Sequence, residues 1–196
     1  GTSSATPLKV AVDGDSVDEI IALVDVDGHP LLYVLNHDHE EKGQPESYQA
    51  YVDDAVRVDA GDLNGDRTDE IVVIRDINAI PMWGEEDVLE VMSIAAPPSG
   101  ESDVGEISLL ASVETLDLED LQDLEVADSD ADTNSEIFVV DSSGKIASFD
   151  LEGSTIYERF SEDLAVNSEP SRIAMADTDG DSPQASLIGD GPVLAK

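Results

Sequence analysis

The sequence contains no cysteine and few basic residues. Without a thiol, disulfide scaffolds, thiolate metal sites and cysteine catalysis are excluded. Nine Lys and Arg residues against 46 Asp and Glu residues give a formal net charge of −37. This charge argues against a nucleic-acid binder and against docking on anionic membranes, because each phosphate contact requires a cation. We therefore predict no nucleic-acid partner.

Long apolar runs are also lacking. The longest, such as Ile20–Val24 and Leu31–Leu35, fall far short of the roughly 20 residues that a membrane-spanning helix needs, so we expect no membrane insertion. Hydrophobic residues still make up 40% of the chain, enough to form a buried core. Residues 1–6 have neither the basic start nor the apolar stretch of a signal peptide and are interpreted as a linker or a mature N-terminus.

An acidic motif recurs along the chain. The segment Asp62-Leu-Asn-Gly-Asp-Arg-Thr-Asp-Glu70, followed by Ile-Val-Val-Ile, matches Asp128-Ser-Asp-Ala-Asp-Thr-Asn-Ser-Glu136, followed by Ile-Phe-Val-Val, position for position. Two weaker copies begin at residues 11 and 177. The four copies begin 51, 66 and 49 residues apart. Because a repeat of this length changes the fold prediction, we interpret the rest of the chain as four units.

Each acidic copy lies between two segments with strand character, a short apolar or alternating segment before it and a β-branched run after it. Further strand-like runs follow, separated by turn signals such as Asp27-Gly28 and Ser143-Gly144. Each unit therefore holds about four strands in about 50 residues, as in a propeller blade. We place the unit starts near residues 8, 55, 121 and 172. Helices are nearly absent, and the stretch Thr115–Leu124 is ambiguous.

The acidic copies have the donors of a calcium site. Asp or Asn at loop positions 1, 3 and 5 and a carboxylate at position 9 direct oxygens to one point, and calcium takes 6 to 8 oxygen ligands. The expected ligands are Asp62, Asn64, Asp66 and Glu70 in the second copy, Asp128, Asp130, Asp132 and Glu136 in the third, Asp13, Asp15 and Glu19 in the first, and Asp177, Asp179 and Asp181 in the fourth. The alternative is a set of acidic turns that only water solvates.

An EF-hand is the obvious competitor for these loops. That motif requires Gly at position 6, Glu at position 12 and flanking helices. Counted from Asp62, those positions hold Arg67 and Val73, and Val73 falls inside a strand-like run. The spacing therefore rejects an EF-hand.

The string from Ala60 to Val73 resembles the FG-GAP/VCBS repeat family, which includes the integrin α-subunit head. The resemblance implies an all-β, β-propeller-like fold of about four blades, each with four short antiparallel strands and a calcium loop between its first and second strands. The departures are Glu70 and Glu136 in place of the usual Asp, Ala131 in place of the loop Gly, Ala11 for the first Asp of copy one, and Ala185 for the last carboxylate of copy four. On this basis residues 7–196 form a single domain.

The resemblance implies a non-catalytic, extracellular binding or adhesion module with Ca²⁺ as its cofactor and a protein or carbohydrate as its ligand. No nucleophile elbow, phosphate loop or His-Glu-x-x-His motif occurs. Two alternatives remain, a structural subunit of a calcium-dependent surface assembly and an accessory domain of a secreted hydrolase or lyase. Trp83 lies between the second and third acidic copies, which are the two neighbouring copies farthest apart in the chain. Its ring is a candidate ligand contact, although core packing of the ring is equally plausible.

Three further expectations concern surface features. The fourth unit is short, and an unfinished blade would leave an unpaired strand edge for self-association. Fifteen of the 46 acidic residues lie in the four loops. The remainder predict a surface suited to a salty exterior, and our hypothesis is a halophilic origin. His37 and His39 stand two residues apart among carboxylates and allow a transition-metal site, although a polar loop is the simpler interpretation.

Overall fold

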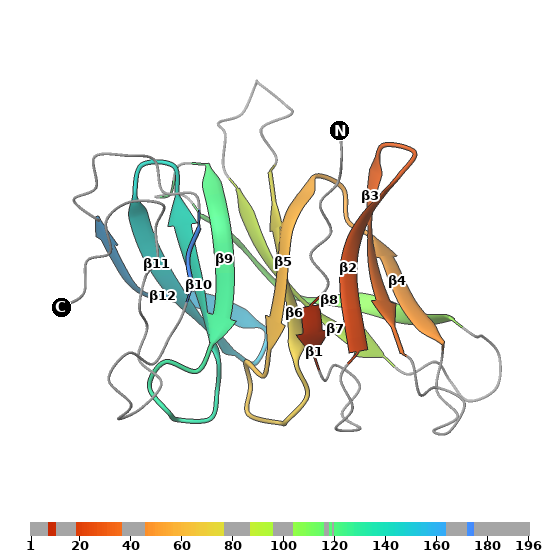
Figure 1. The fold of residues 1–196 in the computed structure, drawn as a ribbon. Helices are drawn as coiled ribbons and strands as arrows, with labels where there is room; N and C mark the ends of the chain where they lie inside the picture. Colours follow the sequence, from red (N-terminus) through yellow and green to blue (C-terminus); the bar gives the residue numbers. More distant parts are fainter. Residues whose placement is uncertain are drawn as a thin grey trace.

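The computed structural model describes residues 8–10, 19–36, 46–76, 87–95, 104–115, 118, 120–163 and 172–174. Within these residues the chain forms twelve strands and no helix (Figure 1). The described segments accordingly contain no apolar helix long enough to cross a membrane. The all-β class predicted from the sequence is confirmed.

The strands are arranged as three successive meanders, each of four antiparallel strands in sequence order. The first meander consists of β1 (Leu8–Val10), β2 (Glu19–Val26), β3 (His29–Leu35) and β4 (Ser47–Tyr51). The second consists of β5 (Ala55–Gly61), β6 (Glu70–Arg75), β7 (Val88–Ala95) and β8 (Val104–Glu114). The third consists of β9 (Leu121–Ala127), β10 (Glu136–Asp141), β11 (Lys145–Glu152) and β12 (Thr155–Asp163).

The first two meanders join into one eight-stranded sheet, with strand order β1-β2-β3-β4-β8-β7-β6-β5, and the third forms a separate four-stranded sheet. The junction is a short parallel pairing of Ser47–Gln49 in β4 with Val104–Glu106 in β8. This corrects the expectation of one sheet per repeat, because the outermost strands of two meanders touch and share hydrogen bonds. The eight-stranded sheet is nearly closed, since its last strand β5 also contacts β1 and β2.

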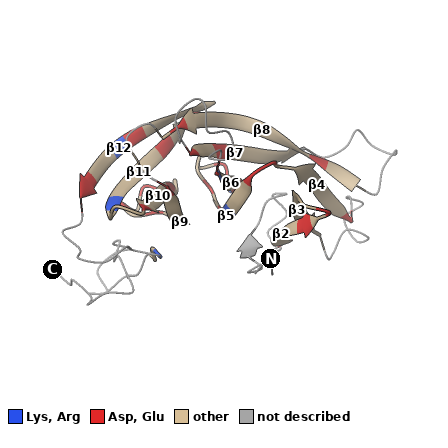
Figure 2. Ribbon diagram, turned by 90° about the horizontal axis from the view of Figure 1, so that it is seen from above, with Lys and Arg blue, Asp and Glu red and all other residues tan. Residues whose placement is uncertain are grey.

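The meanders stand side by side, with their first strands on one side and their last strands on the other. Strand β5 contacts β1 in the preceding meander and β9 in the following one, whereas β8 contacts β4 and β12. Figure 2 shows this arrangement from above, with β8 and β12 along the convex side of an arc and β5 and β9 inside it. Three meanders are described rather than four, and residues 172–174 of the expected fourth unit form no strand.

The second strands of the second and third meanders, β6 and β10, are buried on both of their faces. In β6, Ile71 and Val73 pack in the core shared with the first meander, and Val72 and Ile74 pack in the core shared with the third. In β10 the same alternation places Val139 against the second meander and Val140 beside Ile173. Strands covered on both faces require continuous apolar sequence, which explains the unbroken β-branched runs after the acidic loops.

The seam between β5 and β9 is close because a glycine lies in it. A Cβ atom on Gly61 would approach Val126 Cγ1 to 2.6 Å. Beside it, Asp59 Oδ2 accepts a hydrogen bond from the N–H of Val126 at 2.7 Å. The N–H of Ser135 donates to the carbonyl oxygen of Asp62 at 2.6 Å, so the seam continues into the acidic loops.

Candidate metal centre

Two of the four acidic copies lie within the described residues, and both occupy the connection between the first and second strands of a meander. We call residues 62–69, between β5 and β6, loop 2, and residues 128–135, between β9 and β10, loop 3. The candidate ligands Asp13 and Asp15 of the first copy lie outside the described residues, as do Asp177, Asp179 and Asp181 of the fourth copy. Trp83, His37 and His39 also lie outside them.

In loop 2 the carboxylate of Asp62 shapes the backbone. Its Oδ1 accepts a hydrogen bond from the N–H of Gly65 at 2.7 Å, and its Oδ2 accepts one from the N–H of Arg67 at 2.8 Å. Asp66 Oδ1 accepts from the N–H of Thr68 at 2.8 Å. Gly65 and Arg67 both have positive φ angles, 77° and 71°. The chain therefore wraps around the first carboxylate of the motif.

Loop 3 has the same conformation with different residues. Asp128 Oδ1 accepts from the N–H of Ala131 at 2.7 Å, and Asp128 Oδ2 accepts from the N–H of Thr133 at 3.2 Å. Asp132 Oδ1 accepts from the N–H of Asn134 at 2.9 Å. Ala131 and Thr133 have φ angles of 62° and 85°. Because the left-handed region costs a non-glycine residue about 1–2 kcal/mol, the hydrogen bonds to Asp128 must hold Ala131 there.

The ninth position of each copy is a buried glutamate at the start of the second strand. Glu70 has 4% of its surface exposed and Glu136 has 3%, and Glu19, at the same place in β2, is fully buried. Glu70 Oε2 accepts from the N–H of Leu63 at 2.9 Å. Glu136 Oε2 accepts from the N–H of Ser129 at 2.8 Å and also from its hydroxyl group. The glutamate thus reaches back to position 2 of its own loop.

Burial makes these carboxylates hard to ionise. Desolvation raises the pKa of Glu70 to about 7, against the opposing hydrogen bond from Leu63, and the nearby charges of Asp66 and Asp62 add to the increase. Desolvation also raises the pKa of Glu136, although the hydrogen bonds from Ser129 oppose it. A divalent cation would favour the charged form of both groups.

Loop 3 brings its four predicted ligands together. Asp128, Asp130, Asp132 and Glu136 each offer one carboxylate oxygen, and these oxygens all lie within 4.8 Å of one another. Donors at 2.3–2.6 Å from a calcium ion lie at most about 5 Å apart, so the spacing fits that ion. Among the residues that the structure describes, no other group of three or more His, Asp or Glu side chains converges in this way.

Loop 2 differs from loop 3 at position 3. Asn64 replaces the carboxylate of Asp130, and its Nδ2 donates to Glu70 Oε1 at 2.7 Å. Its Oδ1 accepts from the N–H of Asp66 at 2.9 Å. The three carboxylates of Asp62, Asp66 and Glu70 do not form a converging group of the kind found in loop 3. Loop 2 therefore has the backbone of the site and one charged donor fewer.

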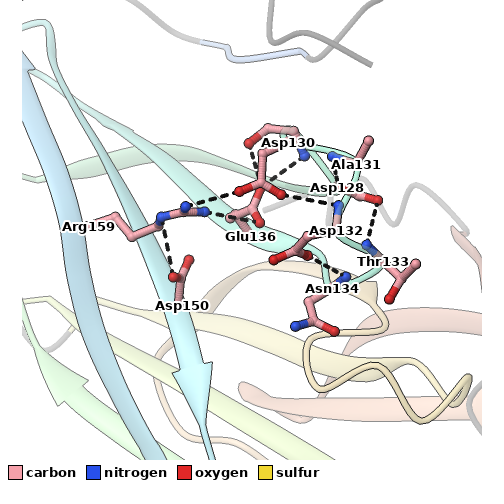
Figure 3. A network of polar contacts seen from close by, with 10 residues as sticks. Asp128, Asp130, Ala131, Asp132, Thr133, Asn134, Glu136, Asp150 and Arg159 are labelled. Atoms are coloured by element: carbon pink, nitrogen blue, oxygen red, sulfur yellow. Dashed lines mark hydrogen bonds and ion pairs between the residues drawn. The ribbon is translucent and has the colours of Figure 1, made fainter. Parts of the chain in front are cut away.

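An arginine from another strand reaches into loop 3 (Figure 3). Arg159, on β12, places its Nη2 atom 3.0 Å from Asp130 Oδ2 and its Nη1 atom 3.3 Å from Glu136 Oε1. Its Nε atom lies 3.3 Å from Asp150 Oδ2 on β11. Arg159 and Asp150 are not predicted from the sequence, because neither belongs to the acidic motif and only the strand register brings them close to it.

Comparisons of the chain with protein-family models, with curated proteins and with solved structures gave no match. The resemblance of the acidic motif to FG-GAP/VCBS repeats therefore rests on the residues of the motif alone.

Proposed function

We propose that the chain is a calcium-stabilised, non-catalytic binding module built from propeller-type repeats. The observation that carries the proposal is the convergence of four carboxylate oxygens in loop 3, within 4.8 Å of one another. Loop 2 supports it, because the same backbone conformation recurs there on a different set of side chains. Loops 2 and 3 keep the same backbone conformation although their side chains differ, which favours a shared ligand over two unrelated acidic turns.

The choice of calcium follows from the chemistry of the donors. All four are carboxylates, and oxygen-only donor sets suit hard cations. Magnesium demands near-ideal octahedral geometry at 2.0–2.1 Å and keeps its water ligands, whereas calcium accepts the wider spacing of a flexible loop. We therefore propose Ca²⁺ as the resident ion, with Mg²⁺ binding more weakly.

The propeller assignment is supported by the order and packing of the meanders. Each acidic loop that the structure describes joins the inner first strand of a meander to its second strand. The start of the fourth unit also packs against the third meander, as the next repeat should. Ile173 is buried beside Phe138, and the N–H of Ile173 donates to Asp123 Oδ2 at 3.0 Å. We propose that the fourth unit continues the arc as a further blade.

The location and the ligand are part of the same proposal. A calcium loop of moderate affinity suits an extracellular setting, where such modules bind calcium with Kd values of about 10⁻⁴–10⁻³ M. An exterior protein or glycan is the proposed ligand, because calcium-ordered repeats offer a rigid scaffold for variable loops. Few Lys and Arg residues appear among the acidic ones in Figure 2, so an anionic ligand is disfavoured.

Calcium binding is tested by thermal unfolding and isothermal titration calorimetry of the whole chain. At a calcium concentration of 100 times Kd, one site adds about 2.7 kcal/mol to the free energy of unfolding. We expect a clear rise in the melting temperature with calcium, a smaller rise with magnesium, and the loss of one binding component in the Asp132→Asn variant. Asp53→Asn is the matched control, because it removes one charge at a side chain that is 71% exposed. Melting curves that coincide with calcium and with a chelator would refute the proposal.

A further inference from the structure

One guanidinium group pairs with three carboxylates around loop 3. Arg159 uses all three of its side-chain nitrogens, with Nη2 toward Asp130, Nη1 toward Glu136 and Nε toward Asp150. Its side chain is 38% exposed, whereas Glu136 is nearly fully buried. A guanidinium group has several N–H donors in a fixed plane and can pair with several carboxylates at once, whereas a lysine ammonium is a compact point charge. Among the residues that the structure describes, Arg159 is the cation that pairs with the converging carboxylates (Figure 3).

These contacts occupy oxygens that a metal ion would need. Asp130 Oδ2 and Glu136 Oε1 pair with Arg159. The other oxygen of Asp130 accepts from the N–H of Asp132 at 3.2 Å, and the other oxygen of Glu136 accepts from Ser129. Every oxygen of these two carboxylates thus already has a protein donor. A divalent cation that enters loop 3 meets a positive charge already bound to two of its four ligands, which repels it.

Loop 2 provides the comparison within the same molecule. There the corresponding oxygen, Glu70 Oε1, is held by the neutral amide of Asn64 instead of by a guanidinium. A cation entering loop 2 therefore displaces an uncharged donor, whereas one entering loop 3 displaces a charged one. The two loops share a backbone but differ in what calcium has to replace.

We propose that Arg159 acts as an internal competitor for the cation of loop 3. When calcium is scarce, the guanidinium neutralises Asp130 and Glu136 and ties β12 to the loop. When calcium binds, Arg159 leaves these two carboxylates and keeps Asp150, so that calcium releases the link between β12 and loop 3. This regulation rests on the proposed calcium function of the loop. It lowers the calcium affinity of loop 3 below the value that its four carboxylates alone would give.

The test is calorimetric titration of the whole chain with calcium, in the wild type and in Arg159→Gln. We expect the loop 3 component, defined as the one that Asp132→Asn removes, to bind about three- to tenfold more tightly in Arg159→Gln. Tenfold corresponds to about 1.4 kcal/mol, in line with the loss of two partly exposed ion pairs. We expect the melting temperature in chelator to fall in the same variant, because the carboxylates lose their counter-charge. A purely structural role for Arg159 would lower both the melting temperature and the calcium affinity.

Two further variants keep the test decisive. Arg159→Lys retains the charge without the fork and should give an intermediate affinity, which also covers the case in which Arg159→Gln fails to fold. Arg57→Gln is the control for net charge, because Arg57 lies on β5 and its Nε donates to the carbonyl oxygen of Gln122. Unchanged or weaker calcium binding in Arg159→Gln overturns the competitor role, as does an equal gain in Arg57→Gln. A wild type that binds no calcium at all overturns the proposed function itself, and the two failures are therefore distinguishable.

Discussion

Asp59 lies on β5 in the seam with β9, and its replacement by asparagine tests how this seam responds to pH. Desolvation raises the pKa of Asp59 from 3.8 to about 7, although hydrogen bonds from the N–H groups of Val126 and Ala60 oppose the rise. The neighbouring charges of Glu125 and Asp123 add to it. The folded protein therefore holds a proton on Asp59 over a pH range in which the unfolded chain has lost it.

The sign of the effect on stability follows from this difference. The contribution of Asp59 is fully present below pH 3.8 and is lost as the pH rises to about 7. At 1.36 kcal/mol per pH unit, the free energy of unfolding falls by about 4 kcal/mol across this window. In Asp59→Asn the side chain is neutral at every pH, and its oxygen can still accept from Val126. The side-chain NH2 group of the new asparagine has no acceptor assigned to it, and leaving it unpaired offsets part of the gain. We therefore expect the variant to be more stable than the wild type by about 2–4 kcal/mol near pH 8.

The assay is urea unfolding from about pH 4 to about pH 8 at one saturating calcium concentration, so that the occupancy of the loops stays constant. Many carboxylates titrate in this range, and the informative quantity is the difference between the variant and the wild type. Asp163→Asn removes the same charge from an exposed position at the end of β12 and should show no such pH-dependent difference. If Asp59→Asn and the wild type give parallel stability curves, or if the variant is less stable near pH 8, the raised pKa of the half-buried Asp59 is wrong.

Two further predictions concern the loops. Replacing Ala131, whose φ is 62°, with glycine should raise the free energy of unfolding by about 1 kcal/mol, measured by thermal unfolding; an unchanged or lower melting temperature would contradict the positive φ. Calcium binding to loop 2 should release a proton below about pH 7, because the pKa of Glu70 is raised to about 7 and the ion requires the carboxylate form. Calorimetry of Asp132→Asn in buffers of different ionisation enthalpy measures that release, and buffer-independent heats would refute it.

The strands could be predicted from the sequence because local patterns specify them. The segments with strand character that were expected on either side of the acidic copies at residues 62–70 and 128–136 are β5, β6, β9 and β10. The ambiguous stretch Thr115–Leu124 contains the start of β9, so the strand pattern and not the helical one applies from Leu121. β-Branched and alternating residues bounded by turn residues fix such elements without long-range information. The motif also predicted that both loops join a first strand to a second strand, as they do.

Contacts between the meanders could not be predicted in this way. The parallel pairing of Ser47–Gln49 with Val104–Glu106 joins segments that are far apart in the chain and carry no motif. In the sequence, nothing distinguishes Gly61 from another glycine at the end of a strand. Only the structure shows that a Cβ atom on Gly61 would lie 2.6 Å from Val126 Cγ1. Arg159 is one of nine basic residues, and only the position of β12 directs it to loop 3. These features depend on packing between repeats, which a single sequence does not reveal.

The acidic motif has a role in the fold as well as in the site. A glutamate buried at the start of the second strand is unfavourable as an isolated charge, and the protein must protonate it, pair it or bind it to a metal. In loop 2 the pKa of Glu70 is raised to about 7, and in loop 3, where the pKa of Glu136 is raised as well, Arg159 pairs with the glutamate. Calcium would replace a proton in the first case and a guanidinium in the second. The N–H of Ser135 in loop 3 donates to the carbonyl oxygen of Asp62 in loop 2, so both exchanges take place beside the same seam between the second and third meanders. Calcium should therefore stabilise the contact between these two repeats as well as the loops themselves.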